Sequence, residues 1–285
     1  MVVGAAVGGD TSPRLTLERV IGTTTCHNRA LGTSRATGDV AYAAGCVVVI
    51  YSPSRNKQLR FFRAEQPVAC LSFSDDARFL AVGERGHNPA VIVWDLRSGE
   101  CRARFAGAHR FAVQCLAFSP CATRLVSVGS KNDGCVHLWD WDGAAPPRQR
   151  AAFASVSASA AAGGMAAAEE AAQGQQAGRK LASAKVSQEV ASVDFSAGGD
   201  YFVTAGVRHL KFWNAAAAVA VALATAAASG GGGGGARRSK ARGGAATTAV
   251  LENRSAVLAA HQGATVADVA CGRGANAGKG TKFSA

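Results

Sequence analysis

Residues 68–95 read VACLSFSDDARFLAVGERGHNPAVIVWD, and residues 113–140 read VQCLAFSPCATRLVSVGSKNDGCVHLWD. Residues 190–214 read VASVDFSAGGDYFVTAGVRHLKFWN, which keeps the same order of small, apolar and aromatic positions. Trp94 and Trp139 close the first two stretches and lie 45 positions apart. The chain therefore contains an internal repeat of about 45 residues that ends in Trp-Asp or Trp-Asn.

This repeat is typical of a β-propeller, in which each repeat forms one four-stranded blade. Side chains alternate between two faces in residues 90–94 and 135–139, as in a strand. Asn132-Asp133-Gly134 predicts a tight turn between two of the strands. We expect an all-β WD40 β-propeller that is incomplete, with about four and a half blades and Ala/Gly-rich disordered insertions. A blade is a scaffold unit, so binding is expected before catalysis.

The spacing of the repeat sets the expected domain organisation. Tyr51 stands 43 positions before Trp94 and marks a degenerate first blade, and Trp213 closes the fourth. The expected order is a disordered N-terminus (1–14), blades one to three (15–142), a disordered insertion (143–184), blade four (185–214), an Ala/Gly-rich linker with a basic cluster (215–264) and the truncated start of a further blade (265–285). An open ring leaves unpaired strand edges, so we expect either the front part of a longer protein or a ring that closes differently.

The composition and charge limit the kinds of partner that the chain is expected to bind. Its 285 residues carry a formal net charge of +12, but the Arg residues are scattered. Specific nucleic-acid binding is not expected, because net charge alone informs only non-specific attraction. One basic cluster is either a nuclear-import or microtubule-contact patch or, the favoured interpretation, a solvated linker; it consists of Arg237, Arg238, Lys240 and Arg242. The apolar run 215–228 is too short to span a bilayer, and an Ala-rich helix or a flexible insertion is expected there.

The Cys and His residues predict neither a metal site nor a cofactor. The eight Cys form no CxxC pair, and no His/Cys set has zinc spacing. Cys70 and Cys115 share one repeat position and are expected to be small buried hydrophobes, which indicates a reduced, intracellular protein. His87 and His209 are expected in loops, without partners at ligand spacing. The Gly-rich stretch 272–280 lacks the spacing of a phosphate-binding loop.

The third blade resembles a complete WD40 repeat. Its polar positions hold His109, Ser127, Asp133 and Trp139. The resemblance implies a hydrogen-bonded tetrad that ties a loop, the middle strand and a turn together, and that gives a buried Trp N–H its acceptor. The same His, Ser and Asp suggest a hydrolase triad, but the repeat positions already account for all three.

The other blades lack this polar set. Blade two has Val82 and Ala64 at the Ser and His positions, and blade four keeps Thr204 but has Val186 at the His position. We expect these blades to depend on apolar packing.

Several stretches resemble one family more closely than a generic repeat does. They are LERVIG (17–22), VAYAAGCVVVIY (40–51), NKQ (56–58), GERGHNPAVIVWD (83–95), LVSVG (125–129), YFVTAG (201–206), RHLKFW (208–213) and DVACGRG (268–274). In this order they look like the N-terminal propeller of the mitogen-activated-protein-kinase-binding and spindle-pole WD-repeat family. The resemblance implies two consecutive propellers and a long disordered tail. The kinase-docking elements lie in that tail, so no residue here inherits kinase binding.

The resemblance also implies a function. We expect a non-catalytic scaffold in spindle-pole or centrosome organisation and stress-kinase signalling, with protein partners, no membrane, and a location in the cytoplasm or on the cytoskeleton, including ciliary bases. The alternative is a substrate-receptor subunit of a ubiquitin ligase, because Trp94-Asp95-Leu96-Arg97 fits the letters of an adaptor motif. An enzyme is the weakest of the three hypotheses.

Overall fold

The structure is a computed structural model that describes residues 17–25, 28–141, 178–229, 249–255, 266, 268–271 and 281–284. Apart from the 3-10 turn η1 (Asn28–Ala30) and the helix α3 (Ala215–Ser229), its elements are strands. These strands form five sheets, in which all pairs but one are antiparallel. The predicted all-β fold, an incomplete propeller, is confirmed.

The first two blades are four-stranded meanders in which each strand pairs with the next along the chain. Blade one consists of β1 (Leu31–Thr33), β2 (Val40–Ala44), β3 (Val47–Ser52) and β4 (Lys57–Arg63). Blade two consists of β5 (Val68–Phe73), β6 (Phe79–Glu84), β7 (Val91–Asp95) and β8 (Cys101–Phe105).

The structure of blade three differs from the predicted insertion at residues 143–184. It consists of β9 (Val113–Phe118), β10 (Arg124–Gly129), β11 (Cys135–Asp140) and β12 (Arg179–Lys185), with β16 (Ala249–Val250) parallel to β12 at its outer edge. Residues 179–184 therefore belong to a strand, although 143–184 was predicted to be an insertion between blades three and four. The extra chain enters blade three before its outer strand, where the small residues of β12 give a weak strand signal. Residues 142–177 lie outside the described residues.

The structure of blade four differs from the predicted linker at residues 215–264. It consists of β13 (Val190–Phe195), β14 (Tyr201–Gly206), β15 (His209–Asn214) and β17 (Asn253–Ser255), so its outer strand lies inside the predicted linker 215–264. The helix α3 follows β15 directly, and the side chain of Asn214 caps it by accepting a hydrogen bond from Ala217 N (2.9 Å). Of the two alternatives for 215–228, the Ala-rich helix is confirmed. Within the described part of the chain, no helix has the length and hydropathy that a bilayer span requires.

The remaining strands, β18 (Asp268–Cys271) and β19 (Thr281–Ser284), form a hairpin where a further blade was predicted to begin. The predicted disordered N-terminus (1–14) and the basic cluster lie outside the described residues, as does the Gly-rich stretch 272–280.

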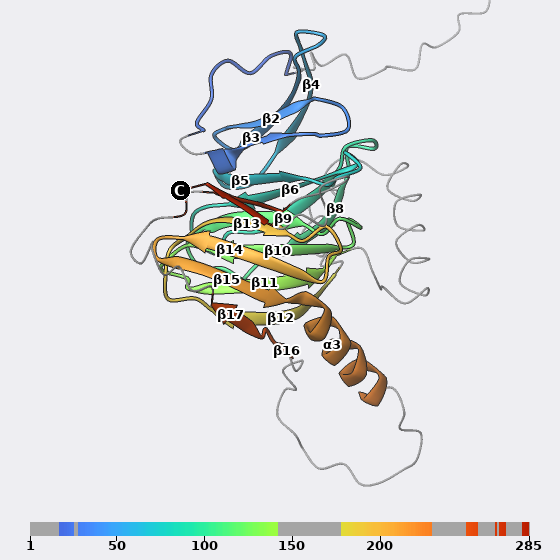
Figure 1. Cartoon of the computed structure of the whole chain (residues 1–285). Helices are drawn as coiled ribbons and strands as arrows, with labels where there is room; N and C mark the ends of the chain where they lie inside the picture. Colours follow the sequence, from blue (N-terminus) through green and yellow to red (C-terminus); the bar gives the residue numbers. More distant parts are fainter. Residues whose placement is uncertain are drawn as a thin grey trace, which may run out of the picture.

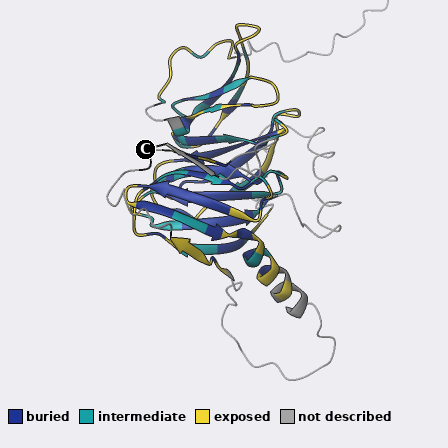
Figure 2. Ribbon diagram, in the orientation of Figure 1, coloured by how far each residue is buried: buried dark blue, intermediate teal, exposed yellow. Residues whose placement is uncertain are grey.

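The inner strands of the blades surround a common centre. Successive contacts run from β1 to β5, β9, β13 and β18. Figure 1 shows the first blade at one end of this arrangement and β17 and α3 at the other. Figure 2 shows that burial follows the strands, whereas the connecting turns are exposed.

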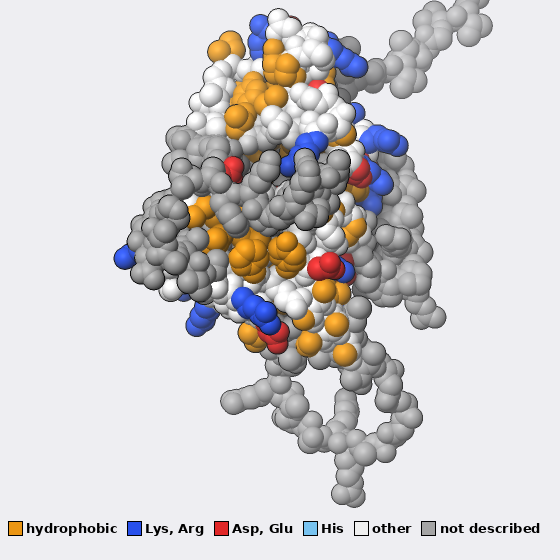
Figure 3. All heavy atoms as spheres, in the orientation of Figure 1, with side chains coloured by type: hydrophobic (Ala, Val, Ile, Leu, Met, Phe, Trp, Pro, Cys, Tyr) orange, Lys and Arg blue, Asp and Glu red, His pale blue; other side chains and the backbone are white. Residues whose placement is uncertain are grey.

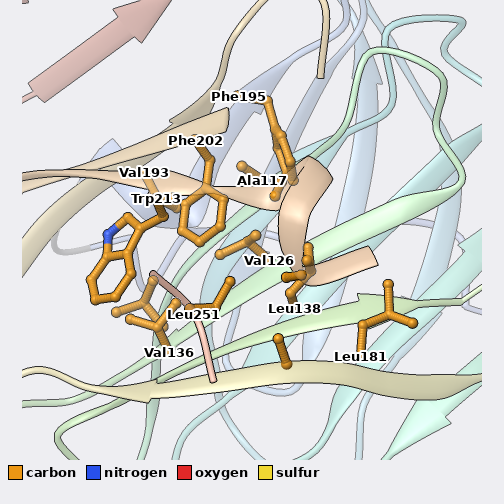
Figure 4. Packing of buried hydrophobic residues seen from close by; sticks show 14 of the residues in the cluster. Ala117, Val126, Val136, Leu138, Leu181, Val193, Phe195, Phe202, Trp213 and Leu251 are labelled. Carbon is orange, nitrogen blue, oxygen red and sulfur yellow. The ribbon is translucent and has the colours of Figure 1, made fainter. Parts of the chain in front are cut away.

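Each hydrophobic cluster is shared by two neighbouring blades. One cluster joins blades one and two, a second joins blades two and three, and a third joins blades three and four. In the third, shown in Figure 4, Phe202 stacks on Trp213 with ring centroids 6.0 Å apart, facing Val126 and Leu138 of blade three. A fourth cluster joins blade four to β18. The core is therefore a series of blade-to-blade interfaces.

Candidate functional site

Three of the four predicted polar residues of blade three form a buried chain of hydrogen bonds. The ring nitrogen Nε2 of His109 lies 2.8 Å from Ser127 Oγ, and Trp139 donates from Nε1 to the same oxygen over 2.8 Å. His109 and Ser127 are 1% and 0% exposed. The chain fastens the loop before β9 to β10 and β11.

Asp133 joins this network through the backbone instead of through His109. Its carboxylate accepts hydrogen bonds from the backbone N–H groups of residues 110, 111 and 112, at 2.7–3.3 Å, and from the hydroxyl of Ser130. Burial alone raises the pKa of Asp133, but these donors outweigh it and hold that pKa below its usual value. Nδ1 of His109 instead faces Cys135 Sγ at 3.4 Å. The tetrad implies a direct hydrogen bond between Asp133 and His109. This part of the prediction is wrong, because Asp133 binds the backbone of the loop instead.

This arrangement is unsuited to nucleophilic catalysis. Burial, and to a lesser extent His137, lower the pKa of His109 to about 3, so the imidazole is neutral at neutral pH. The oxygen of Ser127 is occupied by His109 and Trp139 and has no exposed surface. A hydrolase needs a nucleophile that a substrate can reach and a base that an acid orients, and this trio offers neither.

Blade four contains a second network that the sequence analysis missed. Thr204 Oγ1 lies 2.7 Å from Nε2 of His209 and accepts a hydrogen bond from Trp213 Nε1 over 2.8 Å. The prediction that His209 lies in a loop is wrong, and blade four has a polar network in addition to the expected apolar packing. His209 begins β15 and is 3% exposed. It reaches the hydroxyl from the neighbouring strand, five positions after Thr204, and this offset hides it from comparison with His109.

Blade two has a buried carboxylate at the end of β6. Glu84 has no exposed surface, and its oxygens accept hydrogen bonds from the backbone N–H groups of Glu65, Gln66 and Ala90. Glu84 therefore ties two loops together, as Asp133 does in blade three, in addition to the expected apolar packing of blade two. A charged residue at the end of an apolar strand was the signal available in the sequence.

The repeat aromatic positions differ in burial. Trp94 is buried and packs on Phe62 with ring centroids 5.4 Å apart. Tyr51 is only half-buried, and its hydroxyl hydrogen-bonds Asn56 Oδ1 at 2.5 Å. Both residues follow a register shift between the third and fourth strands of their blades. Tyr51 therefore occupies the place of Trp94, but its side chain is less buried and its hydroxyl binds a partner at the surface.

The centre of the propeller holds two cavities, of about 200 and 160 Å³. The smaller one is lined in part by Arg29, Cys70, Cys115 and Asp268. Burial raises the pKa of Cys115 to about 12, against the lowering effect of Arg29, and burial also raises the pKa of Cys70. These thiols are protonated and inert, as expected for buried cysteines.

The repeat itself decides the family. The model "WD domain, G-beta repeat" matches residues 56–95 and 99–140. The chain is a WD40-repeat protein. The resemblance predicted from its sequence is confirmed by two relatives from Mus musculus. WD repeat-containing protein 62 is 32% identical over 266 residues, which is 93% of this chain and 14% of the relative. Mitogen-activated protein kinase-binding protein 1 is 34% identical over 205 residues, which is 72% of this chain and 11% of the relative.

Two further similarities are more limited. Cilia- and flagella-associated protein 52 of Mus musculus is 33% identical over 101 residues, 34% of this chain and 16% of the relative. A chain in "Crystal Structure of Mitotic Checkpoint Complex" shares 19% identity at a TM-score of 0.49, over 74% of this chain and 57% of that chain. This WD40 chain thus spans only a small part of the curated relatives it matches. WD40 propellers are generally non-catalytic scaffolds for protein interactions.

The surface of this WD40 chain carries the remaining predicted features. Arg97 of the adaptor-like motif is exposed in the turn between β7 and β8, where its backbone N–H donates to Asp95 Oδ1 over 2.8 Å. The predicted contact patch at 237–242 lies outside the described residues. On the face shown in Figure 3, Lys and Arg side chains are scattered over several elements.

Proposed function

We propose that this chain is a non-catalytic interaction platform that works in spindle-pole or centrosome organisation and in mitogen-activated kinase signalling. The observation that carries this proposal is the similarity to mitogen-activated protein kinase-binding protein 1 and to WD repeat-containing protein 62 over most of this chain. The similarity to a third relative, a cilia- and flagella-associated protein, supports a location on the cytoskeleton.

The structure favours one rim of the propeller as the contact surface. Phe111 is 50% exposed although the loop that carries it is firmly held. The carbonyl of Phe111 accepts a hydrogen bond from Gly86 N over 2.8 Å, that of Arg110 accepts one from Asn88 N over 3.1 Å, and Asp133 binds the amides of the same loop. A rigid aromatic side chain at a surface is a favourable anchor, because little side-chain freedom is lost when a partner covers it.

The test compares two surface substitutions in the fluorescently tagged chain. We expect the wild type to concentrate at spindle poles of dividing cells and to co-purify with kinase-cascade proteins, and Phe111→Ser to lose the spindle-pole localisation. Leu59→Ser is the matched control, because Leu59 is an exposed apolar residue (36%) on β4, away from this loop. A diffuse wild type that captures neither group of proteins would contradict the proposal. Equal effects of the two substitutions would contradict the choice of rim.

A second candidate function is supported by the exposure of Arg97. A ubiquitin-ligase receptor must present the arginine of its adaptor motif to the solvent, and Arg97 meets this requirement. Its carbonyl is also held, by a hydrogen bond from the guanidinium of Arg60 over 3.0 Å. If this candidate is right, a ligase adaptor co-purifies with the wild type and is lost in Arg97→Ala, while Arg102→Ala, an exposed arginine on β8, retains it. If no ligase adaptor co-purifies with the wild type, the ubiquitin-ligase function is contradicted. The proposed scaffold function is not affected by that result.

A further inference from the structure

We propose that blade three contains a Zn²⁺ site formed by His109, Cys135 and His137. This inference is independent of the proposed scaffold role, because it concerns the interior of one blade. The sequence predicts no such site, since the three residues lack zinc-finger spacing. The fold brings them together from the loop before β9 and from two inward positions of β11.

The ligand atoms have the required proximity. One ring nitrogen of each His and the sulfur of Cys135 lie within 4.8 Å of one another. Two ligands of one tetrahedral zinc ion are about 3.3–3.6 Å apart, given Zn–N near 2.0–2.1 Å and Zn–S near 2.3 Å. The 3.4 Å between His109 Nδ1 and Cys135 Sγ already fits this range. The imidazole rings of His109 and His137 are 4.9 Å apart and tilted by 52°, so closure on an ion needs side-chain movements of about 1 Å.

His137 supplies an independent observation that points to a ligand. Its Nε2 lies 3.1 Å from the carbonyl oxygen of Ala108, which can only accept a hydrogen bond. The proton of the neutral ring is therefore on Nε2, and Nδ1 carries a lone pair. Nδ1 has no hydrogen-bond partner among the described residues, although the residue is only 6% exposed. A buried acceptor without a donor is unfavourable, and a bound cation would satisfy it.

The second nitrogen of His109 is also suitably placed. With a proton on Nε2, the ring donates to Ser127 Oγ at 2.8 Å and leaves Nδ1 free to bind the ion. A metal-binding His commonly donates its other N–H in this way, which fixes the ring. The network inferred to hold the blade together would then also orient a ligand.

The charge at the cluster permits an ion. The backbone of Gly129 approaches the cluster closely, because an added Cβ would lie 2.6 Å from Asp133 Cβ, 2.8 Å from His109 Nδ1 and 3.2 Å from Cys135 Sγ. The charged groups that act on the cluster are Asp133, which favours a cation, and Lys180, which opposes it. Two imidazoles and a thiolate suit Zn²⁺. On binding, the ion replaces the thiol proton of Cys135, which leaves to solvent, and no electrons are transferred.

The first experiment titrates the purified full chain with Co²⁺ as a spectroscopic substitute, then with Zn²⁺ in competition. We expect one equivalent of Co²⁺ to bind with a thiolate-to-metal absorption band, and Zn²⁺ to abolish that band. Cys135→Ser and His137→Gln should each weaken binding by at least about 100-fold, the upper range found for loss of mere supporting residues around a metal. Cys121→Ser is the control, because Cys121 is an exposed thiol outside the cluster, and it should bind as the wild type does.

A second measurement keeps the test decisive if a variant fails to fold. In the wild-type chain, saturating Zn²⁺ should slow alkylation of Cys135 at least 10-fold, as mapped by mass spectrometry, and a chelator should restore it. Alkylation of Cys121 should not change. The proposal is wrong if Cys135 is equally reactive with and without Zn²⁺, or if a folded Cys135→Ser variant binds the ion as tightly as the wild type.

Discussion

At the scale of single residues, blades two, three and four each hold their loops or strands together with buried hydrogen bonds, but they use different side chains. Blades three and four place a His, a hydroxyl and a Trp in one buried chain of hydrogen bonds, with the His at different places in the sequence. Removing the His leaves the buried hydroxyl without one of its two side-chain partners, while the Trp N–H still donates to it. The networks should therefore contribute to stability to a similar degree.

We predict that His109→Ala and His209→Ala each lower the free energy of unfolding by about 1–3 kcal/mol, the range for unpaired buried polar groups. The measurement is urea denaturation followed by tryptophan fluorescence. His87→Ala is the control, since His87 is exposed, and its midpoint should match the wild type. If the denaturation midpoint of either network variant is unchanged, the hydrogen bond of that histidine does not contribute to stability.

His209 also makes the stability of the folded chain depend on pH. Burial, and to a lesser extent Lys211, lower the pKa of His209 from 6.5 to about 4. Between these values the unfolded chain binds a proton that the folded chain rejects, so stability is complete above about pH 6.5 and falls as the pH drops toward 4. We predict that His209→Gln flattens the slope of unfolding free energy against pH in this window. A slope equal to that of the wild type would show that His209 is charged or exposed in the folded chain.

At the scale of elements, a glycine lies at or next to the end of the second strand in blades two, three and four, where neighbouring atoms approach its Cα closely. An added Cβ at Gly206 would lie 2.9 Å from Val190 Cα and would collide with the carbonyl of Glu189, at the register shift in β13. Gly83 and Gly129 have similarly short contacts. Backbone atoms cannot move aside as the end of a side chain can, so Gly206→Ala forces β13 and β14 apart.

We predict that Gly206→Ala lowers the unfolding free energy by at least about 2 kcal/mol, within or above the usual range for overpacking. Gly32→Ala is the matched control on β1, because its Cβ would meet Phe73 at an ordinary 3.5 Å. Calorimetric melting of both variants measures the difference. Equal melting temperatures would mean that the β13–β14 pairing adjusts more readily than the backbone contacts imply.

The accuracy of the sequence predictions also varied by element. The three inner strands of a blade were predictable because alternation, turn residues and the closing Trp recur with one period. The outer strands β12 and β17 were not, because both follow long stretches of Ala and Gly, and β17 is short and exposed. Glu84 and His209 were missed for a related reason: each satisfies the polar demand of its blade from a position that the complete repeat does not use.

At the scale of the whole molecule, stability should be distributed unevenly. Every hydrophobic cluster joins two neighbouring blades, so blades two, three and four each contribute to two clusters, whereas blade one contributes to one. Where each repeat contacts only its neighbours, stability approximates a sum over repeats and interfaces. Local opening then needs less free energy where fewer interfaces must break.

We predict that backbone amides of β2 exchange with solvent deuterium at least about 10-fold faster than those of β6 and β10, which corresponds to a difference of about 1.4 kcal/mol in opening free energy. Gly206→Ala provides the perturbation: it should accelerate exchange in β14 and, through the shared cluster, in β10, while β2 stays unchanged. Hydrogen exchange with mass spectrometry resolves these strands. Equal acceleration in β2 would mean that the blades open as one cooperative unit, and that the central strand contacts transmit more free energy than the clusters between blades.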